Sequence, residues 1–182
     1  MAQFAKFAAA IVFLLALPAI ALPAQVWAQA AAESEPYVGL GPSGKPVPRF
    51  ESLKYGEVNA RLGPSLDHRV LWTYHRRGLP VKIIAESDVW RQISDPNGDV
   101  SWINAAQLAD GQTVFVEASE PLPIRRNPDS DARPVAILGH GVVAALEECR
   151  GGWRKVRVGD RAGWAPMASL WGGAHCQKAK TS

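Results

Sequence analysis

The chain has 182 residues, with 20 Lys or Arg against 17 Asp or Glu, which gives a formal net charge of +3. Such a nearly balanced charge lacks the basic excess that is typical of nucleic-acid-binding domains. Together with the export signal predicted for residues 1–30, it argues against a nucleic-acid partner.

Residues 1–30 have the features of a secretory signal peptide. Lys6 gives a positive start, residues 7–22 are almost entirely apolar, and Ala28-Gln29-Ala30 offers small residues for cleavage. An uncleaved membrane anchor is the alternative, but the apolar run is shorter than the roughly 20 residues a span needs. The sequence therefore predicts a periplasmic or secreted protein with no transmembrane segment after cleavage.

After the signal, residues 31–54 are predicted to form an extended, largely unpacked leader because Pro, Gly and Ser are frequent there. From Tyr55 onward, short runs typical of strands alternate with Gly, Pro, Asn and Asp. No stretch of eleven or more residues has a clean helical period, so the sequence predicts an all-β fold.

The strongest pattern is an internal repeat at a spacing of 62 to 64 residues. Five blocks recur in the same order, and their spacing drifts by only two residues. The matched pairs are residues 58–64 with 122–128, 78–83 with 141–146, 90–93 with 153–156, 102–103 with 164–165, and 106–108 with 168–170.

The repeat divides the chain into two copies, residues 55–110 and 114–172, followed by a flexible C-terminal tail at 173–182. Each copy is expected to hold four or five short strands. In the first copy, Asn97-Gly98 supplies a hairpin turn. Units this small close most easily as barrels, which leave no strand edge open. Residues 110–112 are the expected seam between the copies.

These blocks resemble the bacterial SH3-like domain family. The resemblance rests on the strand with Asn59-x-Arg61-x-Gly63-Pro64, then Gly78-Leu79-Pro80-Val81, then Trp90-x-x-Ile93 and Trp102-Ile103. Segments such as Pro48-Arg49-Phe50 and Leu170-Trp171-Gly172 are similar to an exported proteobacterial subfamily with tandem copies. The resemblance implies two tandem SH3-like barrels that serve as envelope-targeting or interaction modules.

Cys149 and Cys176 are the two cysteines, and in an oxidising compartment an even number favours a disulfide between them. A free pair, a thiol nucleophile and a metal site with His175 are the alternatives. In the subfamily that the chain resembles, a cysteine often follows the tryptophan of the second copy. Arg154 stands at that position here, and Cys176 from the C-terminal tail is the candidate to replace the missing cysteine.

The sequence predicts no catalytic residue, metal site or cofactor. Cys149 with His140 superficially suggests a thiol hydrolase, but such an enzyme needs a separate catalytic domain, and the two barrels consume the chain. Nucleophile motifs such as Ser-x-x-Lys are missing. We therefore expect a protein that is not an enzyme.

A binding role is better supported. The segment 67–77 between the first strand and Gly78 is rich in aromatic and basic residues, and Trp72 and Tyr74 are candidates for the floor of a ligand groove. Trp90 and Trp102 line the groove if their rings face outward. The alternative, which we favour for these two and for Trp153 and Trp164, is that they pack in the core.

The second copy has few aromatic residues in its matching loop, 129–135, and is expected to be a structural partner of the first. Residues 42–48 of the leader are a hypothetical occupant of a groove on their own chain. The predicted function is recognition of cell-wall peptide or glycan, or of an envelope protein. A structural or assembly subunit is the alternative, and an envelope hydrolase is a weaker one.

Overall fold

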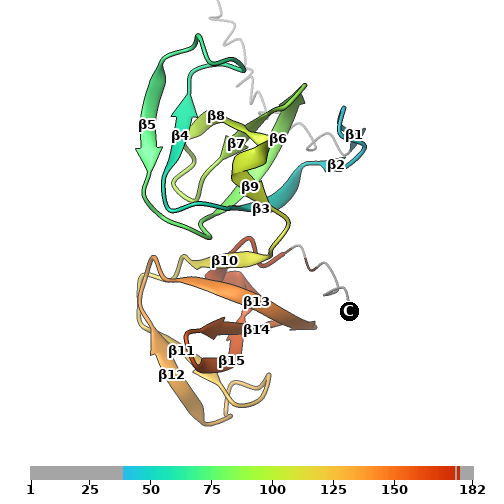
Figure 1. The fold of residues 1–182 in the computed structure, drawn as a ribbon. Coiled ribbons are helices and arrows are strands. Elements are labelled where there is room, and N and C mark those ends of the chain that lie inside the picture. Colours follow the sequence, from blue (N-terminus) through green and yellow to red (C-terminus); the bar gives the residue numbers. More distant parts are fainter. Residues whose placement is uncertain (1–38, 175, 177–182) are drawn as a thin grey trace, which may run out of the picture. The chain divides into compact units, whose positions relative to one another are not determined.

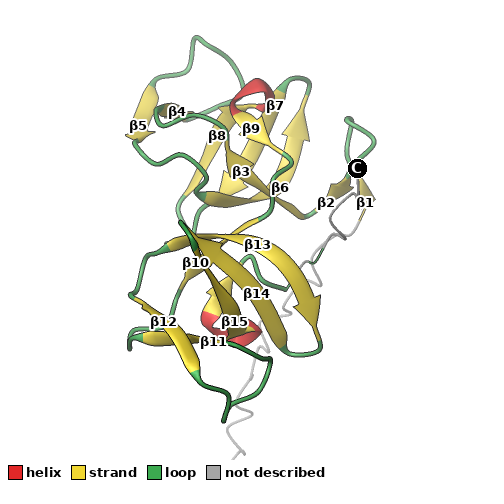
Figure 2. Cartoon of the chain, turned by 60° about the horizontal axis from the view of Figure 1, so that its bottom comes forward, coloured by secondary structure: helices red, strands yellow, loops and turns green. Residues whose placement is uncertain are grey.

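The computed structural model describes residues 39–174 and 176, and the predicted signal peptide lies outside the described residues. Within this part, strands dominate, and the helical structure consists of the 3-10 turns η1 (Ala105–Gln107) and η2 (Met167–Ser169) (Figure 2). The predicted all-β fold is confirmed. None of the described helices has the length and apolarity needed to span a membrane.

The first barrel is a seven-stranded antiparallel sheet with the spatial order β5-β4-β8-β7-β6-β3-β9 (Figure 1). A separate two-stranded ribbon of β1 (Gly39–Leu40) and β2 (Pro46–Val47) precedes it. In chain order the seven strands are β3 (Arg49–Leu53), β4 (Val58–Arg61), β5 (Val70–Tyr74), β6 (Pro80–Ser87), β7 (Trp90–Ser94), β8 (Val100–Asn104) and β9 (Leu108–Ala109).

The second barrel has the order β12-β11-β15-β14-β13-β10-β16, which matches the first strand for strand. The two sheets thus confirm tandem SH3-like barrels. Its strands are β10 (Thr113–Val116), β11 (Leu122–Arg125), β12 (Pro134–Leu138), β13 (Val143–Arg150), β14 (Trp153–Val158), β15 (Arg161–Pro166) and β16 (Leu170–Trp171).

The repeat extends to backbone detail. Gly78 and Gly141, which are 63 residues apart, have φ angles of 77° and 80° just before β6 and β13. Only glycine adopts this left-handed conformation without steric cost. The same turn therefore requires glycine in both copies, which explains the match between these blocks.

Aliphatic residues fill both cores. In the first barrel Val58, Val81, Ile83, Ile93 and Ile103 are fully buried and in mutual contact. The second core is built in the same way. Neither core cluster of the described residues contains a tryptophan. Trp90 and Trp164 are buried, at 8% and 5% exposed, but lie outside these two clusters, whereas Trp102 and Trp153 are partly exposed.

The structure corrects the predicted leader of residues 31–54. Residues 49–53 form strand β3, which pairs with β6 and β9 inside the first sheet. Arg49 and Glu51 stand opposite the buried residues Ile83 and Val81, so they occupy core-facing positions. Because charged residues occupy those positions, apolar and polar residues do not alternate along this segment, and the strand could not be recognised from hydrophobic periodicity.

The number of strands also differs from the expected four or five per copy. Each sheet has seven, because the expected loop at 67–77 contains β5, because β3 lies in the predicted leader, and because β9 and β16 have only two residues each. Trp72 and Tyr74 thus lie on an edge strand, not on a loop. In the predicted tail, Gly173 is buried, while residues 175 and 177–182 lie outside the described residues.

The two barrels make direct contacts. Phe50 of β3 and Trp171 of β16 meet edge to face, with their ring centroids 4.8 Å apart. The hydroxyl of Thr113 donates a hydrogen bond of 2.6 Å to the carbonyl oxygen of Gly78. Phe115 and Val143 of the second barrel also pack against the core cluster of the first. The seam is therefore a packed junction.

Candidate functional site

Trp72 and Tyr74 lie together on the edge strand β5, and we call them the aromatic pair. Their ring centroids are 6.0 Å apart and the rings are nearly perpendicular, at 88°. Each stands opposite a fully buried residue of β4, Trp72 opposite Ala60 and Tyr74 opposite Val58. Both rings therefore lie on the core-facing side of the last strand of the sheet, where each remains partly exposed.

Asp95 fixes the orientation of Tyr74. The tyrosine hydroxyl donates a hydrogen bond of 3.1 Å to one carboxylate oxygen of Asp95, which is only 4% exposed. The other oxygen accepts the backbone N–H groups of Asn97 and Asp99, at 2.9 and 3.0 Å, and so closes the hairpin turn. Burial is the main reason that the pKa of Tyr74 lies well above its ordinary value of 10.0. The ring therefore stays neutral and held in place.

The second barrel shows that the fold does not need this pair. Ala136 stands opposite the buried Ile124, and Leu138 stands opposite Leu122, at the positions where the first barrel has Trp72 and Tyr74. Aliphatic side chains thus complete the same strand of the same barrel. The fold therefore does not require the two aromatic rings of the first copy.

The other two candidate rings lie elsewhere. Trp102 alternates along β8 with the buried residues Ser101 and Ile103, so its ring is on the outer face of the sheet. Trp90, 8% exposed, lies on the same face of β7 because it stands opposite Asn104. The structure therefore does not bring these two rings together with the aromatic pair.

The counterpart of Trp102 in the second barrel is covered. Trp164 is only 5% exposed, and the guanidinium group of Arg150 lies 5.1 Å from its ring centroid. In the first barrel, Ser87 occupies the position of Arg150, because Ser87 pairs with Trp90 and Arg150 pairs with the matching Trp153. Trp102 consequently keeps part of its ring exposed.

The loop between β4 and β5 is braced by Arg61. Its Nη1 atom donates to the carbonyl oxygens of Leu66 and His68, at 3.1 and 2.7 Å. Arg125 makes the matching bond to Ala132, at 2.7 Å. The arginine of the repeated motif therefore holds a loop, and beside it Leu62 and Leu66 remain 55% and 73% exposed.

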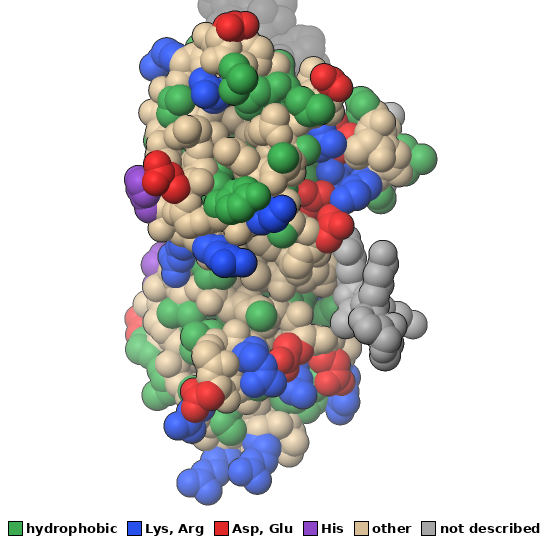
Figure 3. Space-filling view, in the orientation of Figure 1, with side chains coloured by type: hydrophobic (Ala, Val, Ile, Leu, Met, Phe, Trp, Pro, Cys, Tyr) green, Lys and Arg blue, Asp and Glu red, His purple; other side chains and the backbone are tan. Residues whose placement is uncertain are grey.

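A second group of functional candidates, absent from the sequence-based set, lies on the opposite side of the first barrel. The side chain of Glu86 is fully buried and bonded to Arg49 at 2.7 Å and to Arg91 at 3.1 Å. Arg49 also bonds Glu51 at 2.7 Å. We call these four residues the ion network. Figure 3 shows Lys, Arg, Asp and Glu side chains gathered on the side where β1 and β2 lie in Figure 1.

The segment 42–48 contacts its own barrel at this ion network. The backbone N–H and the hydroxyl of Ser43 donate to Glu86 at 2.9 and 2.8 Å, and Lys45 pairs with Asp110 at 2.7 Å. β5 and the β1–β2 ribbon lie on opposite sides of the barrel in Figure 1. The hypothetical occupant of a groove thus docks on its own chain, but away from the aromatic pair.

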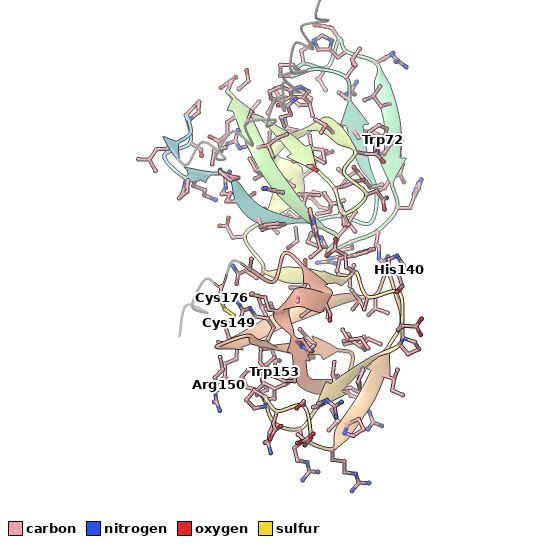
Figure 4. All side chains as sticks on the ribbon, turned by 180° about the vertical axis from the view of Figure 1, so that it is seen from behind. Trp72, His140, Cys149, Arg150, Trp153 and Cys176 are labelled. Atoms are coloured by element: carbon pink, nitrogen blue, oxygen red, sulfur yellow. A yellow bond between two sulfur atoms is a disulfide. The ribbon has the colours of Figure 1, made fainter. Side chains whose placement is uncertain are left out.

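Cys149 and Cys176 form a disulfide, visible in Figure 4, with their Cα atoms 6.3 Å apart. The predicted bridge is confirmed. Arg154, opposite Cys149 on β14, is 6% exposed and bonds the backbone carbonyl groups of Gly151 and Gly173. The residue at the expected cysteine position therefore helps to hold the same C-terminal segment.

One sequence signal did point to the ion network. Arg91 and Arg154 recur in the Trp-Arg blocks of both copies, which indicates a shared structural role. Arg49 and Glu51 fell in the proline-rich segment and had no matched block. Pairing in three dimensions was needed to connect them with Glu86.

A family model described as "Bacterial SH3 domain" matches the chain twice, over residues 54–110 and 118–172. Each match covers six of the seven strands of one sheet, and β3 and β10 lie outside the matches. The search of curated proteins found no match.

Two solved structures from Trichomonas vaginalis show low overall similarity. The "Structure of NlpC2" is 12% identical, with a TM-score of 0.30, and covers 68% of this chain and 47% of its own. The "Structure of NlpC1" is 14% identical, with a TM-score of 0.31, and covers 73% of this chain and 48% of its own. The chain thus spans about half the length of these two proteins.

Proposed function

Because the chain belongs to the bacterial SH3 domain family, matched in both of its barrels, we propose that it is a non-catalytic binding module of the cell envelope. It recognises cell-wall peptide or glycan through the aromatic pair of the first barrel. The second barrel is a structural partner that is packed against the first.

The aromatic pair carries this proposal. Two large rings, held by packing and by the bond from Tyr74 to Asp95, offer apolar contact area that loses little conformational entropy on binding. Their position on an edge strand leaves the neighbouring surface open to an extended chain. At the same positions of the second barrel, Ala136 and Leu138 supply no such surface.

The absence of catalysis is part of the proposal, and the chemistry of Cys149 supports it. A cysteine nucleophile acts as a thiolate, and the sulfur of Cys149 is bonded to Cys176. The disulfide also supports export of the protein, because disulfides persist in oxidising compartments outside the cytosol.

Co-sedimentation of the purified exported chain with murein sacculi, at moderate salt, tests the proposal. We expect the wild-type protein to be retained and Trp72→Ala to lose about tenfold in affinity, since a buried ring typically contributes roughly 1–2 kcal/mol or more to an interface. Trp153→Ala is the matched control, because it removes a partly exposed tryptophan from the second barrel. It should bind as the wild type does.

No retention of the wild-type protein would overturn the cell-wall assignment. Equal losses in Trp72→Ala and Trp153→Ala would overturn the role of the aromatic pair. Circular dichroism of each variant establishes that the loss is not due to unfolding. Turnover of a cell-wall substrate by the purified chain would contradict the non-catalytic assignment.

A further inference from the structure

A pocket of about 360 Å³ opens beside the ion network of the first barrel. Its volume lies within the range typical of small-molecule sites. Four cations and two carboxylates line it: Lys45, Arg49, Lys54, Arg91, Glu51 and Asp110. β3, β7 and β9 supply or flank most of these groups, so the walls are built on the sheet.

The barrel does not need this set of charges. Gln112, Val114 and Cys149 occupy the positions of Arg49, Glu51 and Glu86 in the second barrel, as the pairing of β10 and β14 with β13 shows. The second barrel folds in the same way with no buried ion network there. Since buried ion pairs are seldom more stabilising than apolar residues of similar size, folding alone does not explain the charges.

The carboxylates around the pocket are already paired. Glu86 accepts from two arginines and from Ser43, Glu51 bonds Arg49, and Asp110 bonds Lys45. None of these bonds uses the Nη2 atom of either arginine. The ammonium group of Lys54 lies 5.4 Å from the ring centroid of Tyr55, with no carboxylate among its contacts in the described residues. With Glu86 counted, the four cations face three carboxylates, so these groups keep a net charge of +1.

The rest of the lining is apolar and small. Ala105 of η1 and Leu108 and Ala109 of β9 form this wall. A ligand that fits both parts carries a negative charge next to a short aliphatic group. Paired guanidinium donors match the planar geometry of a carboxylate particularly well.

We propose that this pocket binds the terminal carboxylate of a peptide with a small aliphatic last residue. It is a second site of the first barrel, separate from the aromatic pair, because β5 lies on the other side of the barrel (Figure 1). The ion network holds Arg49 and Arg91 in position, and Lys54 supplies a more exposed charge at the pocket.

Titration of the intact exported chain with N-acetyl-alanyl-alanine, followed by NMR, tests this site. We expect saturable shifts confined to residues around the pocket. The same peptide with an amidated C-terminus should bind at least about tenfold more weakly, since it loses a charge-assisted bond. Lys54→Gln should weaken binding of the acid about five- to tenfold, and Lys155→Gln on the second barrel should not change it.

Equal binding of the acid and the amide would overturn the proposal, and so would an unchanged affinity in Lys54→Gln. Inorganic phosphate that competes as well as the peptide would overturn the assignment to a carboxylate. Trp72→Ala separates the two sites, because it should weaken binding to sacculi about tenfold and leave this titration unchanged. Lys54 is exposed and outside the ion network, so its replacement should not disturb the fold.

Discussion

Glu86 and Cys149 occupy the same position in the two barrels. Each stands opposite a buried arginine of the next strand, Glu86 opposite Arg91 and Cys149 opposite Arg154. Each also fastens a segment outside its sheet. Glu86 binds the N-terminal segment through Ser43, whereas Cys149 binds the C-terminal segment through the disulfide with Cys176. One position of the repeat thus attaches a chain segment by charge in one copy and covalently in the other.

Replacing Glu86 by glutamine should destabilise the first barrel by about 3 kcal/mol, because it leaves the buried guanidinium group of Arg91 without its counter-charge and removes one of the two carboxylate partners of Arg49. The free energy of unfolding in urea measures this change. Glu148→Gln is the control, because its ion pair with Arg150 is exposed and should contribute less than about 1 kcal/mol. Similar losses in the two variants would contradict the role given to Glu86.

Acid should weaken the same part of the molecule. Burial raises the pKa of Glu86, but the bonds from Ser43 and Arg49 together outweigh it, so the pKa lies below its ordinary value of 4.5. A carboxyl group with a lowered pKa stabilises the fold above pH 4.5, and this contribution is lost as the pH falls through the folded-state pKa. Urea unfolding at several pH values below about 5 should show a steeper loss in the wild type than in Glu86→Gln. Parallel curves would refute this assignment.

Removing the disulfide should cost about 3 kcal/mol on the chain-entropy model, since it closes a separation of 27 residues. Cys149→Ser, Cys176→Ser and the double variant should lose the same amount, because any one of them removes the whole bridge. Thermal unfolding of the three variants measures this loss. Additive losses in the double variant would mean that the two sulfurs stabilise the fold separately.

Tyr74 should resist ionisation in alkali. Because burial raises its pKa, the phenol stabilises the fold below about pH 10 and this contribution is lost as the pH rises further. The near-ultraviolet absorbance of tyrosinate, followed from about pH 8 to about 11, should give the same amplitude in the native wild type and in Tyr74→Phe. A smaller amplitude in Tyr74→Phe would show that the phenol titrates normally.

The contact between Phe50 and Trp171 should couple the two barrels. A double-mutant cycle with Phe50→Ala and Trp171→Ala should give a coupling energy of about 1 kcal/mol, as for other edge-to-face ring pairs. Phe50→Ala combined with Trp153→Ala serves as the uncoupled control. If the cycle of Phe50→Ala and Trp171→Ala also gives a coupling energy near zero, this contact does not couple the stabilities of the two barrels.

Strand β3 shows where hydrophobic periodicity stops being informative. The sequence predicted strands at residues whose core-facing side chains are apolar, as in β6 with Val81 and Ile83. In β3 the core-facing side chains of Arg49 and Glu51 are charged, and Arg49 is neutralised by Glu51 and Glu86. Glu86 lies far from β3 in the chain, so no local pattern reveals the partnership.

The candidate site, too, could be predicted only in part from the sequence. Segment 67–77 stood out by composition, and Trp72 and Tyr74 indeed lie together. Asp95, which orients Tyr74, lies in a turn for which the sequence predicted a hairpin but no contact with Tyr74. Trp90 and Trp102 were grouped with the pair as further rings, but the alternation of β7 and β8 places them on the outer face.

The sequence by itself determined the two barrels, because glycine turns, aliphatic alternation and Trp-Arg blocks recur locally at a fixed spacing. Only the tertiary structure decided which charged side chains of the first barrel come together, since that depends on residues from distant strands meeting at one place. Matched positions of the two sheets then separate what every copy needs for folding from what the first copy alone has added.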